Sequence, residues 1–340
     1  MNGAGIGRVS AAVRRAGWRW RGTAAIAAGL AVVLTGCSTA TKVSVGPGPS
    51  SVAILIGGFG SSLPASTYNP LTQTSAALTT TESTFDPTNE PPGCDAQPNM
   101  VTTLRSAGAV ILPFSYNGVH LTGTAAHPTL TVAAYPSSMP STSLPQSVAP
   151  AIASEVDQVH RLWPATRVIV VGHSEGGYVA EQYFLNNFNS SQQAEVAGIF
   201  SLDSPINGIK NEAEVASLLA SIHFPASSAL LDQFQSSWNN AAANDAAIVA
   251  KEGKTSVYVP VGTPNDNVYL IADNPAAGLI SQVLVGSDGQ PKTSASPNFI
   301  DPAAPPLAGL SDPLGVLVSH QCVMDSAAVI RAVAARLPGK

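Results

Sequence analysis

The fold of this chain is decided by the stretch Val168-Ile169-Val170-Val171-Gly172-His173-Ser174-Glu175-Gly176-Gly177. Four β-branched residues in a row, without alternation, are typical of a parallel strand buried on both faces. Beyond Gly177 the sequence favours a helix. The spacing G-x-S-x-G is common by chance, but a strand before it and a helix after it make it specific. It predicts a sharp turn that exposes Ser174 as a nucleophile, with the amides of the helix N-terminus behind it.

Other segments extend this pattern in both directions. Continuous apolar runs predict further buried strands at Val52–Ile56, Ala109–Phe114, Ile199–Leu202 and Val257–Val261. Pro113 and Pro260 lie near the ends of two of these runs, so we expect those strands to be shortened. Apolar residues at helical spacing predict helices over about 152–163, 177–187, 215–222, 230–238 and 326–337. The alternation predicts an α/β fold: a doubly wound, mostly parallel sheet with helices on both faces.

Two segments fall outside this alternation. Residues 61–100 and 119–148 are rich in Ser, Thr and Pro, and we expect long loops over the sheet edge or parts of a lid. The stretch between Leu202 and Val257 is longer than one crossover needs. A helical cap at about 206–250 and extra scaffold helices are both compatible with it.

The first 36 residues have the composition of a secretory signal. Their basic residues are all arginines, no acid occurs among them, and the apolar run Thr23–Leu34 follows. That run is too short to span a membrane as a helix. It ends in Leu34-Thr35-Gly36-Cys37, which resembles the bacterial lipobox. We expect export, with lipid on Cys37 as a membrane anchor or with plain secretion as the alternative, and a flexible tether over 37–50.

Composition narrows the class of protein. A hydrophobic fraction of 45% excludes a disordered chain, and 16 basic against 21 acidic residues exclude a general attraction to nucleic acid. Five of the basic residues lie in the leader, so residues 37–340 carry a net charge of −10. Membrane contact is therefore expected through lipid rather than through charge. A single domain over 51–340 accounts for the low charged fraction of 11%.

A serine hydroxyl needs a base to remove its proton and a carboxylate to orient that base. Asp266 lies in a loop just beyond the Val257–Val261 strand, and His320 precedes the last predicted helix. The chain order Ser174…Asp266…His320 is the order found in α/β-hydrolases. Asp203, at the end of the Ile199–Leu202 strand, is the alternative acid. The remaining histidines are less suitable as the base because of their positions in the turn, in helical stretches or in a polar loop: His173, His160, His223, His120 and His127.

On these residues the sequence resembles the α/β-hydrolase superfamily, in particular its lipase- and esterase-like members, over about residues 51–338. The resemblance implies a second oxyanion amide in the glycine loop Ile56-Gly57-Gly58-Phe59-Gly60-Ser61, where the family often has His-Gly. The oxyanion amides would be those of Phe59 and Glu175. The implied activity is hydrolysis of carboxylic esters by a monomer without a cofactor, on a small-molecule or lipid ester. A thioesterase, a peptidase, an acyltransferase and a non-catalytic envelope lipoprotein remain alternatives.

Cysteine and metal motifs add little chemistry of their own. If Cys37 is lipidated, Cys94 and Cys322 remain as an even pair in an oxidising compartment, and we expect a disulfide between them, with two buried free thiols as the alternative. No H-E-x-x-H, paired C-x-x-C or phosphate-loop motif occurs, so no metal or nucleotide is expected.

Overall fold

The computed structural model describes residues 48–86, 99–205, 216, 220, 226–255, 257–261, 284–285, 291–292 and 323–338. Several predictions fall outside these ranges: the signal peptide, the lipobox, most of the tether and of the helix over 215–222, and the residues Cys94, Asp266, His320 and Cys322. None of the helices within the described ranges is long and apolar enough to cross a membrane.

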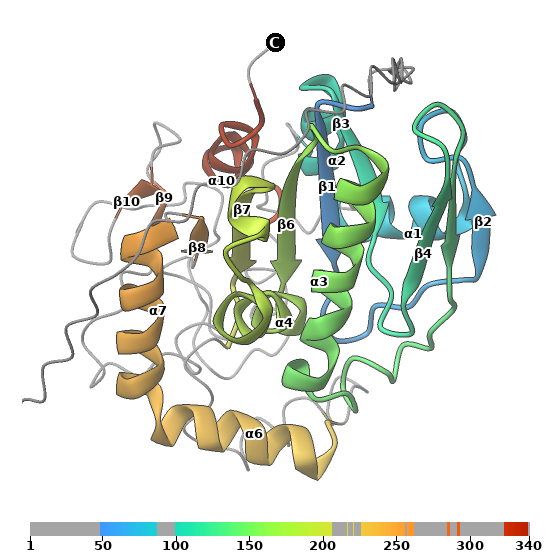
Figure 1. The fold of residues 1–340 in the computed structure, drawn as a ribbon. Coiled ribbons are helices and arrows are strands. Elements are labelled where there is room, and N and C mark those ends of the chain that lie inside the picture. The colour runs from blue at the N-terminus through green and yellow to red at the C-terminus, as the bar shows by residue number, and fades with distance from the viewer. Residues whose placement is uncertain are drawn as a thin grey trace, which may run out of the picture. The chain divides into compact units, whose positions relative to one another are not determined.

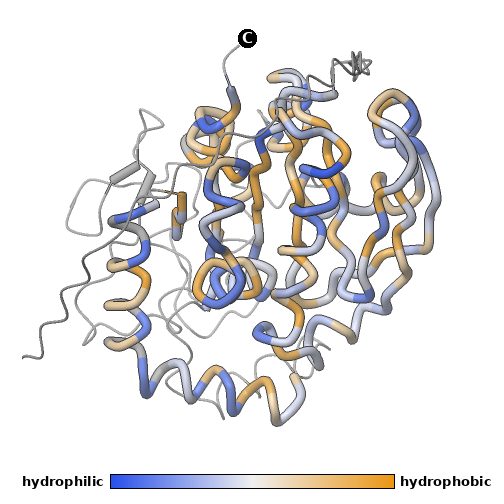
Figure 2. Tube along the Cα trace, in the orientation of Figure 1, coloured by the Kyte–Doolittle hydropathy of each residue, from blue (hydrophilic) through white to orange (hydrophobic). Residues whose placement is uncertain are grey.

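The core is a five-stranded sheet in which every neighbouring pair is parallel. Its order is β3-β1-β6-β7-β8, formed by Ala109–Pro113, Ser51–Ile56, Arg167–His173, Val196–Leu202 and Tyr258–Val261. Every residue of β1 and of β7 is buried, as the unbroken apolar runs predict for strands covered on both faces. Figure 2 shows the hydrophobic residues running along these central strands.

Both strands are one residue shorter than their predicted runs, since β3 ends before Phe114 and β8 begins after Val257, but each strand keeps its proline. Pro113 is the last residue of β3 and pairs with Leu55, and Pro260 lies inside β8 and pairs with Ser201. Both strands are the outer ones of the described sheet. An outer strand needs backbone donors on one side only, so it can hold a proline that an inner strand would reject.

Helices cover the sheet in two groups, as the alternation predicts. One group is α3 (Pro145–Leu162) and α4 (Glu175–Gln182), which pack against each other and lie in front of the sheet in Figure 1. The other is α2 (Met100–Ser106) and α10 (Ala327–Ala334), which also contact each other. The predicted buried stripe of α3 is confirmed, because it consists of fully buried residues: Ile152, Val156, Val159 and Trp163.

The helix predicted after Gly177 is confirmed, with a change of type at its end. The first part is α4, and the chain continues as a π-helix, η1 (Tyr183–Asn187). The last predicted helix corresponds to α10, whose Val329, Ile330 and Val333 are buried. Three short elements also occur: the 3-10 turn η2 (Gln192–Ala194) and the antiparallel strands β9 (Leu284–Val285) and β10 (Pro291–Lys292), all within the described residues.

The prediction of long loops over 61–100 and 119–148 is wrong for the described part of these segments. They contain α1 (Ala76–Phe85) and a three-stranded antiparallel sheet of order β2-β5-β4, formed by Ser66–Tyr68, Pro128–Val132 and Val119–Gly123. In β4, Val119 and Leu121 are buried while His120 is exposed. This alternation is the period-2 signal of a strand with one face in water, hidden in a segment rich in Thr and Pro.

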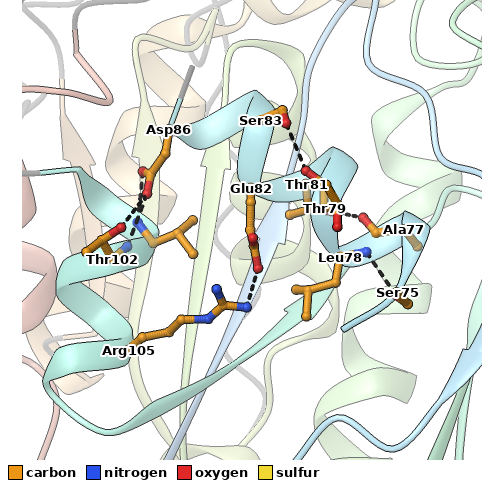
Figure 3. Close-up of polar contacts among 11 residues, drawn as sticks. Ser75, Ala77, Leu78, Thr79, Thr81, Glu82, Ser83, Asp86, Thr102 and Arg105 are labelled. Atoms are coloured by element: carbon orange, nitrogen blue, oxygen red, sulfur yellow. Dashed lines mark hydrogen bonds and ion pairs between the residues drawn. The ribbon is translucent and has the colours of Figure 1, made fainter. Parts of the chain in front are cut away.

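Polar contacts join α1 to α2 across residues 87–98 (Figure 3). The Asp86 carboxylate at the end of α1 accepts hydrogen bonds from the backbone N–H and the hydroxyl of Thr102, at 3.1 and 3.3 Å. An ion pair joins Glu82 of α1 to Arg105 of α2. Asp86 thus supplies the negative charge that the N-terminus of α2 favours.

Helices α6 (Ser228–Asn239) and α7 (Ala241–Thr255) lie in the chain between β7 and β8. The helix predicted over 230–238 corresponds to α6, whose Leu230 and Phe234 are fully buried. No sequence signal singled out α7. The Lys251 ammonium of α7 donates hydrogen bonds to the carbonyls of Phe184 and Leu185 in η1, the second at 3.0 Å. This contact ties α7 to the π-helix.

Candidate active site

Ser174 occupies a strained turn between β6 and α4. Its φ and ψ are 59° and −130°, and Ser174 and Asp203 are the non-glycine residues with positive φ in the described chain. Such a conformation costs on the order of 1–3 kcal/mol and persists only where the surroundings enforce it. Here the Ser174 N–H donates to the Leu202 carbonyl of β7 at 2.9 Å. The strain is at the residue that the sequence predicts as the nucleophile.

The glycines around Ser174 are required by close backbone contacts. A Cβ on Gly172 would come within 2.2 Å of the Gly176 carbonyl oxygen, and one on Gly176 within 2.3 Å of the Ile56 oxygen. Neither contact leaves room for any side chain, because the blocking atoms belong to the backbone. The spacing G-x-S-x-G is therefore the local condition for strand β6 to turn into helix α4 next to β1.

The Ser174 hydroxyl is not used to cap its helix. Ser174 is the N-cap residue of α4, yet its side chain makes no capping hydrogen bond, and the residue is 8% exposed. A serine at this position ordinarily accepts a hydrogen bond from an amide of the first turn. The partial positive charge of the α4 N-terminus therefore lies beside a hydroxyl that does not cap the helix.

The glycine loop after β1 packs directly against this turn. Its Ser61 N–H donates to the Gly58 carbonyl at 3.1 Å, and Gly60 has a φ of 78°, as the third residue of a type II turn requires. A Cβ on Gly58 would lie 2.5 Å from the Ser174 Cβ and 2.9 Å from the Glu175 nitrogen. The two segments predicted to supply the oxyanion amides are thus in contact.

Both predicted oxyanion amides lie where a donor is free. No hydrogen bond in the described chain uses the Phe59 N–H, and Glu175 is the first residue of α4, so its N–H has no acceptor within the helix. The loop also agrees with a glycine at position 57, where the resemblance leads to an expectation of histidine. A Cβ on Gly57 would come within 2.7 Å of the Ser61 Cβ, so the tight turn leaves no space for a side chain there.

The topology places this site at the switch point of the sheet. From β1 the chain goes to β3 on one side and later returns to β6 on the other side of β1. Crevices for ligands form at the carboxyl ends of strands where the connections diverge in this way. Gly57 follows the end of β1 and Ser174 follows the end of β6, so both segments of the candidate site lie at the carboxyl ends of strands at this switch point.

The Glu175 side chain is a feature that the sequence analysis missed. It is completely buried, and its Oε2 lies 2.8 Å from the hydroxyl of Tyr116, which also contacts the Gly57 carbonyl at 2.9 Å. Burial raises the pKa of the Glu175 carboxyl well above its ordinary value, and the Tyr116 hydrogen bond lowers it by less. Tyr116 lies three residues beyond the carboxyl end of β3, and that position was the available signal.

Of the two candidate acids, Asp203 lies within the described residues and Asp266 does not. Asp203 follows β7, is fully buried and has a φ of 41°; its N–H donates to the Val261 carbonyl at 2.8 Å. It directly follows Leu202, whose carbonyl holds the Ser174 backbone. Asp266 and His320 lie outside the described residues, so their predicted roles stay predictions.

Among the other histidines, His160 lies on a helix as expected, whereas His120 lies on strand β4 and not in a loop, and His223 lies outside the described residues. His160 on α3 is partly exposed and lies 3.2 Å from Glu195. His120 is exposed on β4, and His127 is exposed in the turn that follows, while His173 is buried as the last residue of β6. The described residues contain no group of three or more His, Cys, Asp or Glu able to hold a metal ion.

Helix α6 adds an apolar wall beside the glycine loop. The Phe234 ring contacts the Phe59 ring edge to face, with centroids 6.4 Å apart, and the Tyr178 ring of α4 at 5.4 Å. The Tyr178 hydroxyl is hydrogen-bonded to Ser237, and Gln233 donates to it at 3.3 Å. These contacts place the middle of α6 against the loop that carries a predicted oxyanion amide.

The parallel sheet, the helices on both its faces and the strained serine turn after β6 define the α/β-hydrolase fold. A family model described as Mbeg1-like matches residues 145–219, the segment from the start of α3 to beyond β7. The search of curated proteins gave no match.

Two solved structures are similar to the chain at low identity. The product of the gene lin2722 from Listeria innocua is 13% identical, with 69% of this chain and 81% of that chain covered and a TM-score of 0.34. A structure reported with carboxylesterases of the thaumarchaeon Nitrososphaera gargenis is 11% identical, with 69% and 79% covered and a TM-score of 0.35. Both TM-scores are low, and neither likeness carries an argument about this chain.

Proposed function

We propose that the protein is an exported serine hydrolase that cleaves carboxylic esters through an acyl-enzyme. Ser174 is the nucleophile, His320 the base and Asp266 the acid that orients it. The observation that carries the proposal is the backbone of Ser174. A serine held at a φ of 59°, with its hydroxyl free of the helix cap and Gly58 against its Cβ, is the arrangement that an acyl-transfer nucleophile needs.

In the first half-reaction His320 takes the proton of the Ser174 hydroxyl while the oxygen attacks the ester carbonyl. The negative charge that develops on the carbonyl oxygen is stabilised by the N–H groups of Phe59 and Glu175. Asp266 holds the imidazole and stabilises its cation. The tetrahedral intermediate then collapses, the bond to the alcohol oxygen breaks, and the alcohol leaves with the proton from His320.

In the second half-reaction a water molecule replaces the alcohol. His320 removes a proton from the water, whose oxygen attacks the acyl carbon, and the same two amides again stabilise the oxyanion. The bond to Ser174 breaks, the serine oxygen recovers a proton from His320, and the carboxylic acid is released. No cofactor takes part in either step.

The apolar surroundings of the loop support an ester with a hydrocarbon acyl group. Phe59, Phe234 and Tyr178 bring three aromatic rings together beside the predicted oxyanion amide, and Leu230 and Leu231 of α6 are buried in the same cluster. Apolar surroundings of this kind favour apolar over charged substrates. In this proposal α6 belongs to a cap that shapes the acyl pocket.

The proposal includes export and attachment through lipid on Cys37, and a disulfide between Cys94 and Cys322 that anchors the loop of His320. Growth of the producing cells with labelled palmitate tests the lipid, which Cys37→Ala should abolish. Reduction of the purified protein tests the disulfide. Unchanged thermal stability and activity after reduction would exclude a structural bridge.

A fluorophosphonate probe tests the proposed chemistry directly, because it reacts with an activated serine and needs no knowledge of the substrate. We expect labelling of the wild type and none of Ser174→Ala. Ser204→Ala is the matched control, since Ser204 is also buried and its hydroxyl donates to the Leu202 carbonyl at 2.9 Å. Labelling that persists in Ser174→Ala, or an unlabelled wild type, would contradict the proposal and favour a binding role.

A panel of p-nitrophenyl esters of increasing chain length then defines the substrate. The apolar wall predicts a higher kcat/KM for medium and long chains than for acetate. A protein that reacts with the probe but with none of the esters would direct the search to thioesters, peptides or acyl transfer.

A further inference from the structure

The Tyr116 hydroxyl has two oxygen partners but only one hydrogen, so one of these two contacts needs a hydrogen from the partner if both are hydrogen bonds. The Tyr116 oxygen lies 2.9 Å from the Gly57 carbonyl oxygen and 2.8 Å from Glu175 Oε2. The hydroxyl has one hydrogen, and the carbonyl can only accept. If the Tyr116 hydrogen goes to Gly57, the second contact needs a hydrogen from Glu175, and a protonated carboxyl group provides it.

The surroundings of Glu175 agree with a neutral carboxyl group. The side chain is fully buried, and its Oε1 has no hydrogen-bond partner within the described chain. An ionised group there would leave a charged oxygen without a donor, which is strongly unfavourable in a buried site. Burial raises the pKa of Glu175 well above its ordinary value. The titratable groups that face it are Tyr116 and, behind that ring, Tyr135, and burial raises the pKa of both.

These contacts connect the two halves of the predicted oxyanion hole. Gly57 begins the loop that carries the Phe59 N–H, and the Glu175 backbone carries the other N–H. The chain of hydrogen bonds therefore runs from the Glu175 carboxyl through the Tyr116 hydroxyl to the Gly57 carbonyl. No other side chain in the described residues bonds to both segments.

A second aromatic residue supports the same loop from its far end. The Tyr135 hydroxyl is 3.2 Å from the Ser61 hydroxyl, and the rings of Tyr135 and Tyr116 are in edge contact with centroids 5.1 Å apart. Tyr135 does not contact Glu175 or Gly57 through a hydrogen bond. It is therefore a support for the ring of Tyr116 and for the turn at Ser61.

We propose that Glu175, as a neutral acid, and Tyr116 are positioning residues that hold the Gly57–Phe59 loop against the nucleophile turn and so keep both oxyanion amides in register. This inference rests on the proposed serine-hydrolase function. Neither side chain touches the reacting atoms: both act through the backbone to which they bond. A shift of about 1 Å in such a donor costs on the order of 100-fold in rate.

The test compares rates of fluorophosphonate labelling and p-nitrophenyl ester kinetics in three variants. Tyr116→Phe removes both hydrogen bonds while keeping the ring, and we expect kcat and the labelling rate to fall roughly 10- to 100-fold with little change in KM. Glu175→Leu should show the same loss. Glu175→Gln should recover most of what Glu175→Leu loses, because the amide N–H₂ can donate to the Tyr116 oxygen as the acid does.

Glu155→Gln is the matched control. Glu155 is also fully buried, and both its oxygens are without a hydrogen-bond partner in the described chain, but it lies on α3 and contacts neither loop. We expect its labelling rate to equal that of the wild type. Thermal unfolding of each variant shows whether it is folded. If Glu175→Leu does not fold, the labelling rates of Tyr116→Phe and Glu175→Gln still test the inference.

The outcomes separate the two proposals. An unlabelled wild type overturns the serine-hydrolase proposal and this inference with it. If the wild type is labelled and Tyr116→Phe is labelled equally fast, the inference is overturned while the serine-hydrolase proposal stands. The same holds if Glu175→Gln is labelled as slowly as Glu175→Leu. A higher KM with an unchanged kcat in Tyr116→Phe would also contradict a role in oxyanion positioning.

Discussion

Glu175→Gln should change how the stability of the protein depends on pH. The Glu175 carboxyl has an ordinary pKa of 4.5 in the unfolded chain, and burial raises its pKa well above that value in the folded state. Between these two values the folded protein holds a proton that the unfolded chain has released. Stability from this group is complete below pH 4.5 and is lost progressively as the pH rises toward the folded pKa.

The size of the effect follows from one proton. Each pH unit in this window changes the free energy of unfolding by about 1.4 kcal/mol for each group whose protonation differs between the two states. Glutamine does not titrate, so the unfolding free energy of Glu175→Gln minus that of the wild type should rise by about 1.4 kcal/mol for each pH unit above about pH 5.5, until the pH approaches the folded-state pKa. The variant becomes more stable relative to the wild type as the pH rises.

Urea unfolding, followed by tryptophan fluorescence at several pH values, measures this difference. Glu155→Gln serves as a positive control, since burial also raises the pKa of Glu155 well above its ordinary value. Because the two sites share no hydrogen-bond partner, their effects should add in the double variant. Parallel curves for Glu175→Gln and the wild type over this range would show that Glu175 is ionised in the folded protein, and would refute the hydrogen-counting argument at Tyr116.

Three further predictions concern the rest of the site and its supports. Asp266→Asn should lower kcat roughly 10⁴-fold while Asp203→Asn keeps most of it, measured with a p-nitrophenyl ester; the reverse result would make Asp203 the acid. Gly58→Ala should cost about 1–3 kcal/mol in urea unfolding and slow labelling roughly 100-fold or more, because its Cβ would lie 2.5 Å from the nucleophile's Cβ; an active, stable variant would show that the loop can move away. Lys251→Met should lower stability by about 1–3 kcal/mol through loss of its bonds to the η1 carbonyls without changing the labelling rate, and a loss of labelling would link α7 to the site.

The parts of the fold that the sequence predicts are those whose signals are local. Strands such as β1 and β7 are buried along their whole length, so each is an unbroken apolar run in the sequence. The turn at Ser174 is equally local, because Gly172 and Gly176 are required by atoms only a few residues away or on the adjacent strand. The position of the candidate nucleophile followed from ten consecutive residues.

The parts that the sequence analysis missed depend on contacts between distant segments or on weak patterns. Tyr116 bonds to Gly57 and to Glu175, each 59 residues away, and only the register of β3, β1 and β6 brings the three together. Strand β2 has three residues, too few for an alternation to be recognised. Helix α7 is rich in alanine, which favours a helix without marking an apolar face.

The proline at the end of β3 has a consequence for how copies of this protein meet. Phe114 donates its N–H to the Leu55 carbonyl of β1 at 3.1 Å, so the backbone donors of alternate residues point inward and the donor position of Pro113 points away from the sheet. A proline offers no hydrogen there. A second copy aligning its own outer strand along β3 would lack a ladder bond at this position, and the edge is a poor template for continuing the sheet from one molecule into the next. For a protein that we propose to be attached to a membrane by lipid, a proline at this position would weaken strand pairing between neighbouring copies.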